Sequence, residues 1–174
     1  PNRRGRTGTL LNFPDDAHLL ADGKFMVADI RNCRILIVNP KDSHIDTQWG
    51  QPGQCRHNPP HQLAFPNGAT PTENGDIIVS EISGSWVSRI TRAGKVLWSM
   101  PAPHVRYPSD TFPTVDGKQM IVADFNKPGR VVIFDPATKK ATWESFFTEG
   151  DKVLHHPSSA RERPGTGDVL IVGD

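Results

Sequence analysis

The sequence lacks several features that would place it in a common class of protein. Its 20 Lys and Arg residues are nearly balanced by 19 Asp and Glu residues, which argues against a general nucleic-acid binder. No apolar run approaches the roughly 18 residues of a membrane-spanning helix. No secretory signal is recognisable, and the first residue is Pro1 rather than Met. We therefore expect either that a leader was removed or that the sequence is part of a longer one.

Motifs of familiar active sites are missing too. There is no Gly-rich phosphate loop, Ser-His-Asp order or Cys-His constellation. Two cysteines without a CxxC pair argue against a zinc-thiolate or redox motif. Among the seven histidines, His57 and His61 are four apart, but Pro59 and Pro60 lie between them and forbid a helix. A helical zinc pair is therefore not expected.

The dominant feature that is present is an internal repeat. Four segments begin with an aromatic residue or His followed by Pro, and their prolines, at 14, 66, 108 and 157, are 42 to 52 residues apart. A turn dipeptide follows in the first three copies: Asp22-Gly23, Asn74-Gly75 and Asp116-Gly117. Such dipeptides favour two-residue hairpins. Gly and Pro, 31 of 174 residues, therefore mark strand boundaries rather than disorder.

Each copy continues with the same landmarks. A short β-rich stretch ends in an acid, an arginine begins a second apolar stretch, and a third stretch closes on tryptophan. The acids are Asp29, Glu81, Asp124 and Asp174; the arginines are Arg34, Arg89 and Arg130; the tryptophans are Trp49, Trp98 and Trp143. Because they recur once per copy, we interpret the acids and arginines as forming acid–arginine or acid–backbone pairs that fix the loop between the second and third strands. The tryptophans are interpreted as packing anchors between copies.

A unit of about 45 residues with four short strands is the blade of a β-propeller. The sequence therefore predicts an all-β propeller with four-stranded antiparallel blades, three complete and a fourth in part. The predicted divisions are blade one at 13–50, an insertion at 51–64, blade two at 65–100, blade three at 107–147 and partial blade four at 156–174. Rings usually hold four to eight blades. The chain is accordingly part of a six- to eight-bladed ring, half of a dimeric propeller, or an irregular four-bladed ring.

The repeat resembles the NHL-type and quinoprotein-type propeller families. The stretches "VADIRNCRILIVNP" and "IVADFNKPGRVVIFDP" are similar to the NHL pattern of acid, loop, Arg and apolar strand. The stretches "FDPATKKATW" and "TRAGKVLW" are similar to the tryptophan-ended outer strand of quinoprotein repeats. The resemblance extends from Thr9 to Asp174 and implies a fold, because propellers carry many unrelated activities.

Both cysteines fall at or near the insertion. Cys33 is expected in the loop between the second and third strands of blade one, and Cys55 lies 22 residues further on. The two loops can share one rim of a blade, so we predict a Cys33–Cys55 disulfide, with free buried thiols as the alternative. A disulfide would imply an exported protein, periplasmic or extracellular.

Propeller ligands usually bind at the central channel, where the innermost strands converge. The residues after the repeated prolines carry side-chain oxygens, and those expected to be able to ligate a hard cation such as Ca²⁺ are Asp15, Asp16, Asn67 and Asp110. The stretch "FPNG" resembles the "PNG" of gluconolactonase- and paraoxonase-like propellers, which implies a metal-binding role for Asn67 alone. The competing interpretation is that these residues are turn formers and strand caps.

Further candidate binding residues are Ser109, Ser158, His18, His156 and Trp86. His18 is expected on an innermost strand, and His156 replaces the aromatic residue before the fourth repeated proline. A resemblance to arylsulfotransferase-type propellers, which use a channel histidine as nucleophile, would give either histidine that role. Trp86 breaks the repeat, so it is either a contact surface or buried beside the insertion.

Two hypotheses of function follow. The first is a non-catalytic binding or scaffold propeller that binds a protein partner or small ligand at its rim or channel. The second is a propeller enzyme, with calcium-dependent lactone or ester hydrolysis preferred over sulfuryl transfer and over quinone-dependent oxidation. Open blade edges would also favour self-association. No nucleic-acid partner and no transmembrane segment are expected.

Overall fold

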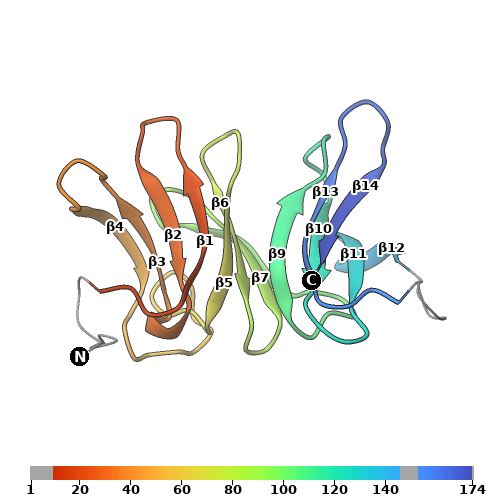
Figure 1. Ribbon diagram of the computed structural model, residues 1–174, viewed down its shortest axis with the longest axis horizontal. Helices are drawn as coiled ribbons and strands as arrows, with labels where there is room; N and C mark the ends of the chain where they lie inside the picture. Colours follow the sequence, from red (N-terminus) through yellow and green to blue (C-terminus); the bar gives the residue numbers. More distant parts are fainter. Residues whose placement is uncertain (1–9, 146–152, 174) are drawn as a thin grey trace.

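The computed structural model describes residues 10–145 and 153–173, and these form three four-stranded sheets and one two-stranded sheet (Figure 1). Each sheet is an antiparallel meander of consecutive strands. Blade one is β1 (Pro14–Leu19), β2 (Phe25–Asp29), β3 (Arg34–Val38) and β4 (Ile45–Gly50). Blade two is β5 (Pro66–Pro71), β6 (Ile77–Glu81), β7 (Trp86–Ile90) and β8 (Val96–Pro101). Blade three is β9 (Pro108–Pro113), β10 (Met120–Asp124), β11 (Arg130–Asp135) and β12 (Lys140–Glu144). Blade four contributes β13 (Pro157–Glu162) and β14 (Val169–Gly173).

This arrangement confirms the predicted β-propeller with three blades and part of a fourth. The inner strands β1, β5, β9 and β13 lie next to one another in that order, so they form the wall of the channel. The predicted hairpin glycines between the first two strands of each complete blade, Gly23, Gly75 and Gly117, all have positive φ. Glycine adopts this conformation without the steric cost of a Cβ atom. The ends of the predicted divisions at 147 and 174, and the acid Asp174, lie outside the described residues.

The hydrophobic core lies between blades rather than within one of them. One cluster joins blades one and two, a second joins blades two and three, and a third joins blades three and four. Trp49 is buried in the first cluster and Trp98 packs against the second, as predicted for anchors between blades. Trp143 differs, because 43% of its surface is exposed. Trp143 lies opposite Ile133 in the neighbouring strand, and the Ile133 side chain packs toward blade four. The described strands of blade four are the two innermost ones, and Trp143 is on the outermost strand of blade three.

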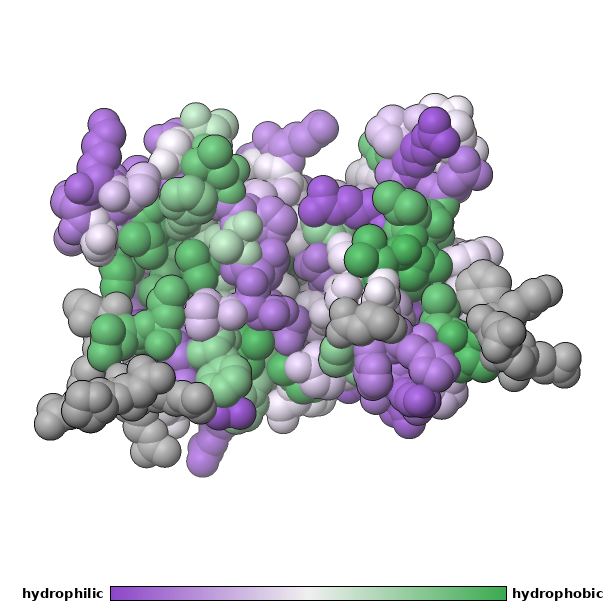
Figure 2. All heavy atoms as spheres, viewed as in Figure 1, coloured by the Kyte–Doolittle hydropathy of each residue, from purple (hydrophilic) through white to green (hydrophobic). Residues whose placement is uncertain are grey.

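Apolar side chains are exposed on the two outer flanks of the row of blades. Leu19 and Phe25 are 67% and 40% exposed on blade one, and Leu170 and Val172 are 68% and 54% exposed on β14. Figure 2 shows hydrophobic surface on both flanks. In a propeller, such faces are the ones that pack against the next blade.

The insertion, residues 51–64, runs along the rim of blades one and two and is covalently fixed to blade one. Cys33 and Cys55 form the predicted disulfide, with their Cα atoms 5.2 Å apart. A short 3₁₀ helix, Ile30–Asn32, precedes Cys33. His57 and His61 lie in irregular chain, as expected from the prolines between them. Within the described ranges, no helix has the length and apolar character needed to cross a membrane.

Candidate functional site

A bulge in each inner strand determines how the residues after the repeated prolines are placed. The strand register shifts directly after Pro14, Pro66 and Pro157, and the equivalent shift in blade three lies beside Ser109 and Asp110. An extra residue in one strand bends it and redirects side chains, and such bulges are frequent next to functional sites. Asp15, Asp16 and Ser159 of these bulges bond across to the neighbouring blade, whereas Ser158 bonds within its own blade.

The first residues after the repeated prolines are joined by hydrogen bonds that cross three blades. The Asn67 side-chain nitrogen donates to Asp15 Oδ2 over 2.7 Å and lies 3.3 Å from the carbonyl oxygen of Ser109. Tyr107 Oη donates to the Asn67 side-chain oxygen over 3.2 Å. Asn67 and Ser109 are buried. Burial raises the pKa of Asp15, with the Asn67 hydrogen bond opposing the effect.

The next positions form what we call the channel cluster, which consists of Asp16, His18, Asp110, Ser159 and Arg161. Asp16 Oδ2 accepts the Ala69 backbone N–H over 2.9 Å and lies 3.0 Å from His18 Nε2. Ser159 Oγ donates to Asp110 Oδ2 over 3.1 Å. The cluster therefore gathers side chains from β1, β9 and β13, strands that belong to three different blades.

Burial and mutual charge perturb the titrating groups of the channel cluster. Burial raises the pKa of Asp110 to about 6, the Asp16 carboxylate adds to the effect, and the Ser159 hydrogen bond opposes it. The hydrogen bond to Asp16 raises the pKa of His18, while burial opposes it. Asp110 Oδ1 is buried without a hydrogen-bond partner. It lies above Gly68, where a Cβ atom would come within 3.1 Å of it.

A hollow with a volume of about 300 Å³ opens beside the cluster. Phe112 contacts two basic side chains in its wall. The Arg161 guanidinium lies 3.8 Å from the ring centroid, and the His18 ring makes a T-shaped contact with centroids 6.5 Å apart. Thr70 and Glu73 contribute further polar groups to the lining. Perturbed titrating groups beside a concave surface are a physical indicator of a functional site.

The four predicted metal ligands all lie on the channel wall, but their contacts are with one another and with neighbouring protein groups. Asn67 directs its nitrogen at Asp15, and its oxygen, the atom a cation would require, is bonded to Tyr107. Within residues 10–145 and 153–173, no three His, Cys, Asp or Glu side chains are grouped so as to hold a metal ion. Calcium binding at these residues stays a prediction.

Other predicted binding residues lie outside the channel cluster. Ser158 Oγ donates to the Val172 carbonyl of its own blade over 3.4 Å. The His156 ring packs against Phe125, with centroids 4.9 Å apart. The Trp86 ring stacks on His57 of the insertion, which favours the alternative that Trp86 is covered by that segment.

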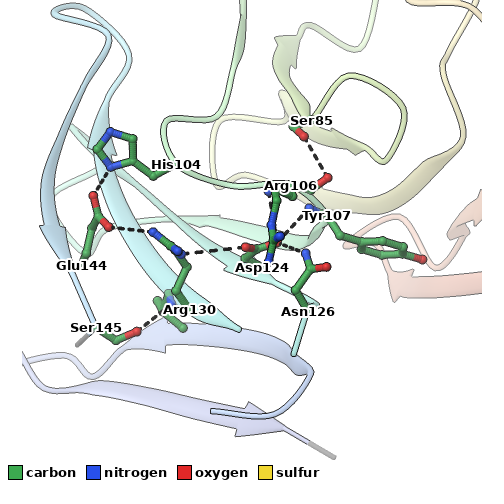
Figure 3. A network of polar contacts seen from close by, with 10 residues as sticks. Ser85, His104, Arg106, Tyr107, Asp124, Asn126, Arg130, Glu144 and Ser145 are labelled. Atoms are coloured by element: carbon green, nitrogen blue, oxygen red, sulfur yellow. Dashed lines mark hydrogen bonds and ion pairs between the residues drawn. The ribbon is translucent and has the colours of Figure 1, made fainter. Parts of the chain in front are cut away.

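The predicted acid–arginine pairs form in two of the three complete blades. In blade one, Arg34 Nε lies 2.8 Å from Asp29 Oδ2, and both side chains are buried. In blade three, Arg130 Nε lies 4.0 Å from Asp124, which also accepts the backbone N–H groups of Arg106 and Tyr107 (Figure 3). These acids fix the segment that leads into their own blade's inner strand.

In blade two the acid–arginine pair does not form, and the acid–backbone alternative holds instead, because Glu81 Oε2 accepts the backbone N–H of Ala64. Arg89 pairs with Asp76 at 2.9 Å, while Glu81 Oε1 lies 2.9 Å from His57 Nδ1 of the insertion. His57 Nε2 in turn lies 3.0 Å from Ser99 Oγ. Neither the Ser99–His57–Glu81 contact nor the approach of Arg161 and Phe112 to the channel was expected from the sequence. In the sequence, the only feature that indicated the first contact was that Glu81 replaces Asp in its repeat. The only feature that indicated the second was that Arg161 follows the fourth repeated proline.

Comparison with known proteins places the chain among β-propellers. No protein-family model matches it, and no curated protein matches it. Among solved structures, Kuenenia stuttgartiensis hydrazine synthase matches with a TM-score of 0.69 at 13% identity over 98% of this chain and 44% of that one. A catalytically inactive virginiamycin B lyase from Staphylococcus aureus with quinupristin matches with a TM-score of 0.64 at 19% identity over 96% and 50%. A Bacteroides caccae protein of unknown function matches with a TM-score of 0.63 at 18% identity over 92% and 56%.

The chain thus spans about half the length of the solved propellers that it matches. At these identities the likeness shows the fold alone. The propeller scaffold is shared with at least one enzyme, virginiamycin B lyase, and propellers in general carry many unrelated activities.

Proposed function

We propose that the chain belongs to a ligand-binding β-propeller and that its channel cluster binds a small polar ligand. The observation that carries the proposal is the convergence of Asp16, His18, Asp110 and Arg161, from three blades, beside one hollow lined by Phe112. Asp16, His18 and Asp110 are partly buried, which is costly for charged groups, and none of the four residues belongs to the hydrophobic clusters between blades.

The charges of the cluster indicate the class of ligand. Two acids face two basic groups, so the cluster is close to balanced and favours a ligand that is neutral or zwitterionic. Asp110 Oδ1 is buried without a hydrogen-bond partner and Asp110 does not line the hollow, so this carboxyl group contributes its charge to the site rather than a direct contact. Arg161 and His18 supply donors, and the Phe112 ring supplies an apolar surface between them. Amino acids, sugars and polyols carry the required mixture of donors and acceptors.

Calorimetric titration with sets of amino acids, sugars and polyols tests this proposal. We expect at least one compound to bind, and Asp110→Ala and Arg161→Ala each to weaken that binding at least tenfold. Arg163→Ala, which removes an exposed arginine from the same hairpin, is the matched control and should leave binding unchanged. Binding that is equally strong in all three variants would place the ligand elsewhere and contradict the proposal.

A calcium-dependent hydrolase remains the second candidate, favoured by the presence of Asp15, Asp16, Asn67 and Asp110 on adjacent inner strands. It requires that Tyr107 release the Asn67 oxygen, because that atom is now hydrogen-bonded. Calorimetric titration with CaCl₂ tests the candidate. Binding that disappears in Asp15→Asn and Asp16→Asn would support it, and the absence of calcium binding would remove it.

The ring that contains these blades is proposed to be a six- to eight-bladed propeller of the NHL or quinoprotein kind. Support comes from the exposed flanks at Leu19 and Leu170 and from Trp143, whose equivalents Trp49 and Trp98 are covered by the following blade. With such flanks uncovered, the 19.2 kDa chain is expected to self-associate. Light scattering on purified protein tests this, and a monodisperse 19.2 kDa particle at high concentration would contradict it.

Export from the cytoplasm is proposed on the basis of the Cys33–Cys55 disulfide, since such bonds persist in oxidising compartments. Alkylation of the protein in its native host without reductant, followed by mass spectrometry, tests the proposal. Unlabelled cysteines are expected, and labelling of both thiols would contradict it.

A further inference from the structure

A chain of hydrogen bonds crosses from the core of blade two to the insertion. Ser88 Oγ lies 2.8 Å from Ser99 Oγ, and Ser99 Oγ lies 3.0 Å from His57 Nε2. On the other side of the ring, His57 Nδ1 lies 2.9 Å from Glu81 Oε1. A serine, a histidine and a carboxylate are thus connected through the two different ring nitrogens of the histidine.

The direction of the hydrogen bonds follows from the surroundings of Glu81. Burial raises the pKa of Glu81 to about 7, while its Oε2 accepts the backbone N–H of Ala64, which favours the ionised carboxylate, so Glu81 is ionised above about pH 7. An ionised Glu81 accepts the Nδ1 proton of His57, and Nε2 is then left as the acceptor of the Ser99 hydroxyl proton. Ser88 in turn donates to Ser99 Oγ. This is the arrangement in which a histidine can act as general base toward a serine.

The packing of the three groups also suits that role. Glu81 is fully buried, while the His57 side chain is 19% exposed and Ser99 is partly exposed, so the acid is shielded from solvent and the other two residues are less so. The Trp86 ring lies against His57 with centroids 3.8 Å apart and planes within 6°, which holds the imidazole in one orientation. The disulfide at Cys55 fixes the insertion two residues before His57.

We propose that Ser99 is a nucleophile that accepts acyl groups from small esters, with His57 as its general base and Glu81 as the residue that positions His57. Ser99 Oγ forms a bond to the ester carbonyl carbon while its proton passes to His57 Nε2. The bond from that carbon to the alkoxy oxygen then breaks, and the alcohol leaves with the proton from His57. Water hydrolyses the acyl-serine by the same route and regenerates the hydroxyl. This site lies on the outer strand β8, apart from the channel cluster on the inner strands, and is independent of the proposed ligand-binding function.

Two reagents test the proposal on the intact chain. A fluorophosphonate should phosphonylate Ser99, identified by peptide mass spectrometry, and p-nitrophenyl acetate should be hydrolysed at least tenfold faster than by Ser99→Ala. His57→Gln should reduce both reactions at least tenfold. Ser83→Ala, which changes an exposed serine of the same blade outside the hydrogen-bond chain, should retain labelling at Ser99 and the hydrolysis.

The pH profile separates a catalytic role from a structural one. Burial raises the pKa of Glu81 to about 7 and lowers the pKa of His57. The phosphonylation rate of the unmodified chain should therefore rise with pH through about 7, as Glu81 loses its proton, and this measurement does not depend on any variant folding. Absence of the adduct, an adduct on another residue, or labelling of Ser99 that is unchanged in His57→Gln would overturn the proposal.

Discussion

Trp86 lies flat against the imidazole of His57, with ring centroids 3.8 Å apart and planes within 6°. The two residues come from blade two and from the insertion, so the stack is a direct contact between the repeat and the segment that interrupts it. It accounts for the departure of Trp86 from the repeat, because this tryptophan packs against the insertion that precedes blade two.

Trp86→Ala should loosen the insertion. Loss of a stacked aromatic pair removes about 1 kcal/mol beyond the buried area, so the expected loss of stability is roughly 1–3 kcal/mol. Urea unfolding gives this value, and hydrogen exchange should show faster exchange of the Asn58 and Gln62 amides, which bond to each other's carbonyls. Trp143→Ala, at a tryptophan that is 43% exposed, should cost clearly less. Equal costs would contradict the importance of the stack.

Asp110→Asn should change how stability depends on pH. The pKa of Asp110 is raised to about 6 in the folded state, so the folded protein holds this proton more tightly than the unfolded chain does. The resulting contribution to stability is fully present below about pH 3.8 and is lost as the pH rises through about 6. Asn has no such proton, so the variant should gain roughly 1–3 kcal/mol relative to the natural chain between pH 4 and 8.

Urea unfolding of both proteins at pH 4 and pH 8 gives the comparison. Asp168→Asn, in an exposed turn of the β13–β14 hairpin, makes the same charge change at the surface and is the control. A stability difference between Asp110→Asn and the natural chain that does not change with pH would show that Asp110 is not held in the environment described.

Arg34→Ala should be among the most damaging substitutions in the chain. Arg34 and Asp29 are buried together, and removing one member of a buried ion pair strands the other, at a cost of about 3–5 kcal/mol. Arg89→Ala is the matched change in blade two, where the arginine is 21% exposed and pairs with Asp76. It should cost less than Arg34→Ala, because Arg89 is partly exposed and Asp76 keeps a hydrogen bond from Asn74. Thermal unfolding of the two variants side by side distinguishes them, and a larger loss for Arg89→Ala would refute the comparison.

Reduction of the Cys33–Cys55 disulfide should destabilise the chain by about 3 kcal/mol on the loop-entropy estimate. It should also release the insertion, so that His57 separates from Glu81 and Ser99. Comparing chemical unfolding with and without reductant measures the first effect. The second is seen if Trp86 fluorescence changes on reduction in a chain whose other tryptophans have been replaced by Phe. An unchanged signal would mean that the stack holds without the disulfide.

The repeat made the fold predictable. Landmarks such as Asp22-Gly23 and Trp49 recur at fixed places because each blade requires a tight turn between strands and a side chain that packs against the next blade. The Cys33–Cys55 bond was predictable for a related reason, since strand order in a blade determines which loops share a rim. Trp143 was predicted less well, because its cover depends on what lies beyond the strand that carries it.

The sites were less predictable because they depend on departures from the repeat. His57 displaces the expected partner of Glu81, and Arg89 then pairs with Asp76, yet no periodic pattern marks the position of a side chain within the insertion. The channel cluster depends on bulges after the repeated prolines, which redirect Asp16 and Asp110 toward neighbouring blades. A bulge adds one residue to a strand and leaves the hydrophobic alternation nearly unchanged, so the sequence gives little sign of it.

The central claim is that the channel cluster is a binding site, and the NMR signals of the histidine rings test it most directly. Spectra are recorded with and without the amino acids, sugars and polyols used for calorimetry. The account predicts that a binding compound shifts the His18 ring signals and leaves those of His44, in an exposed turn, in place. A compound that binds while the His18 signals stay unchanged, or a complete set that shifts no His18 signal, would contradict it.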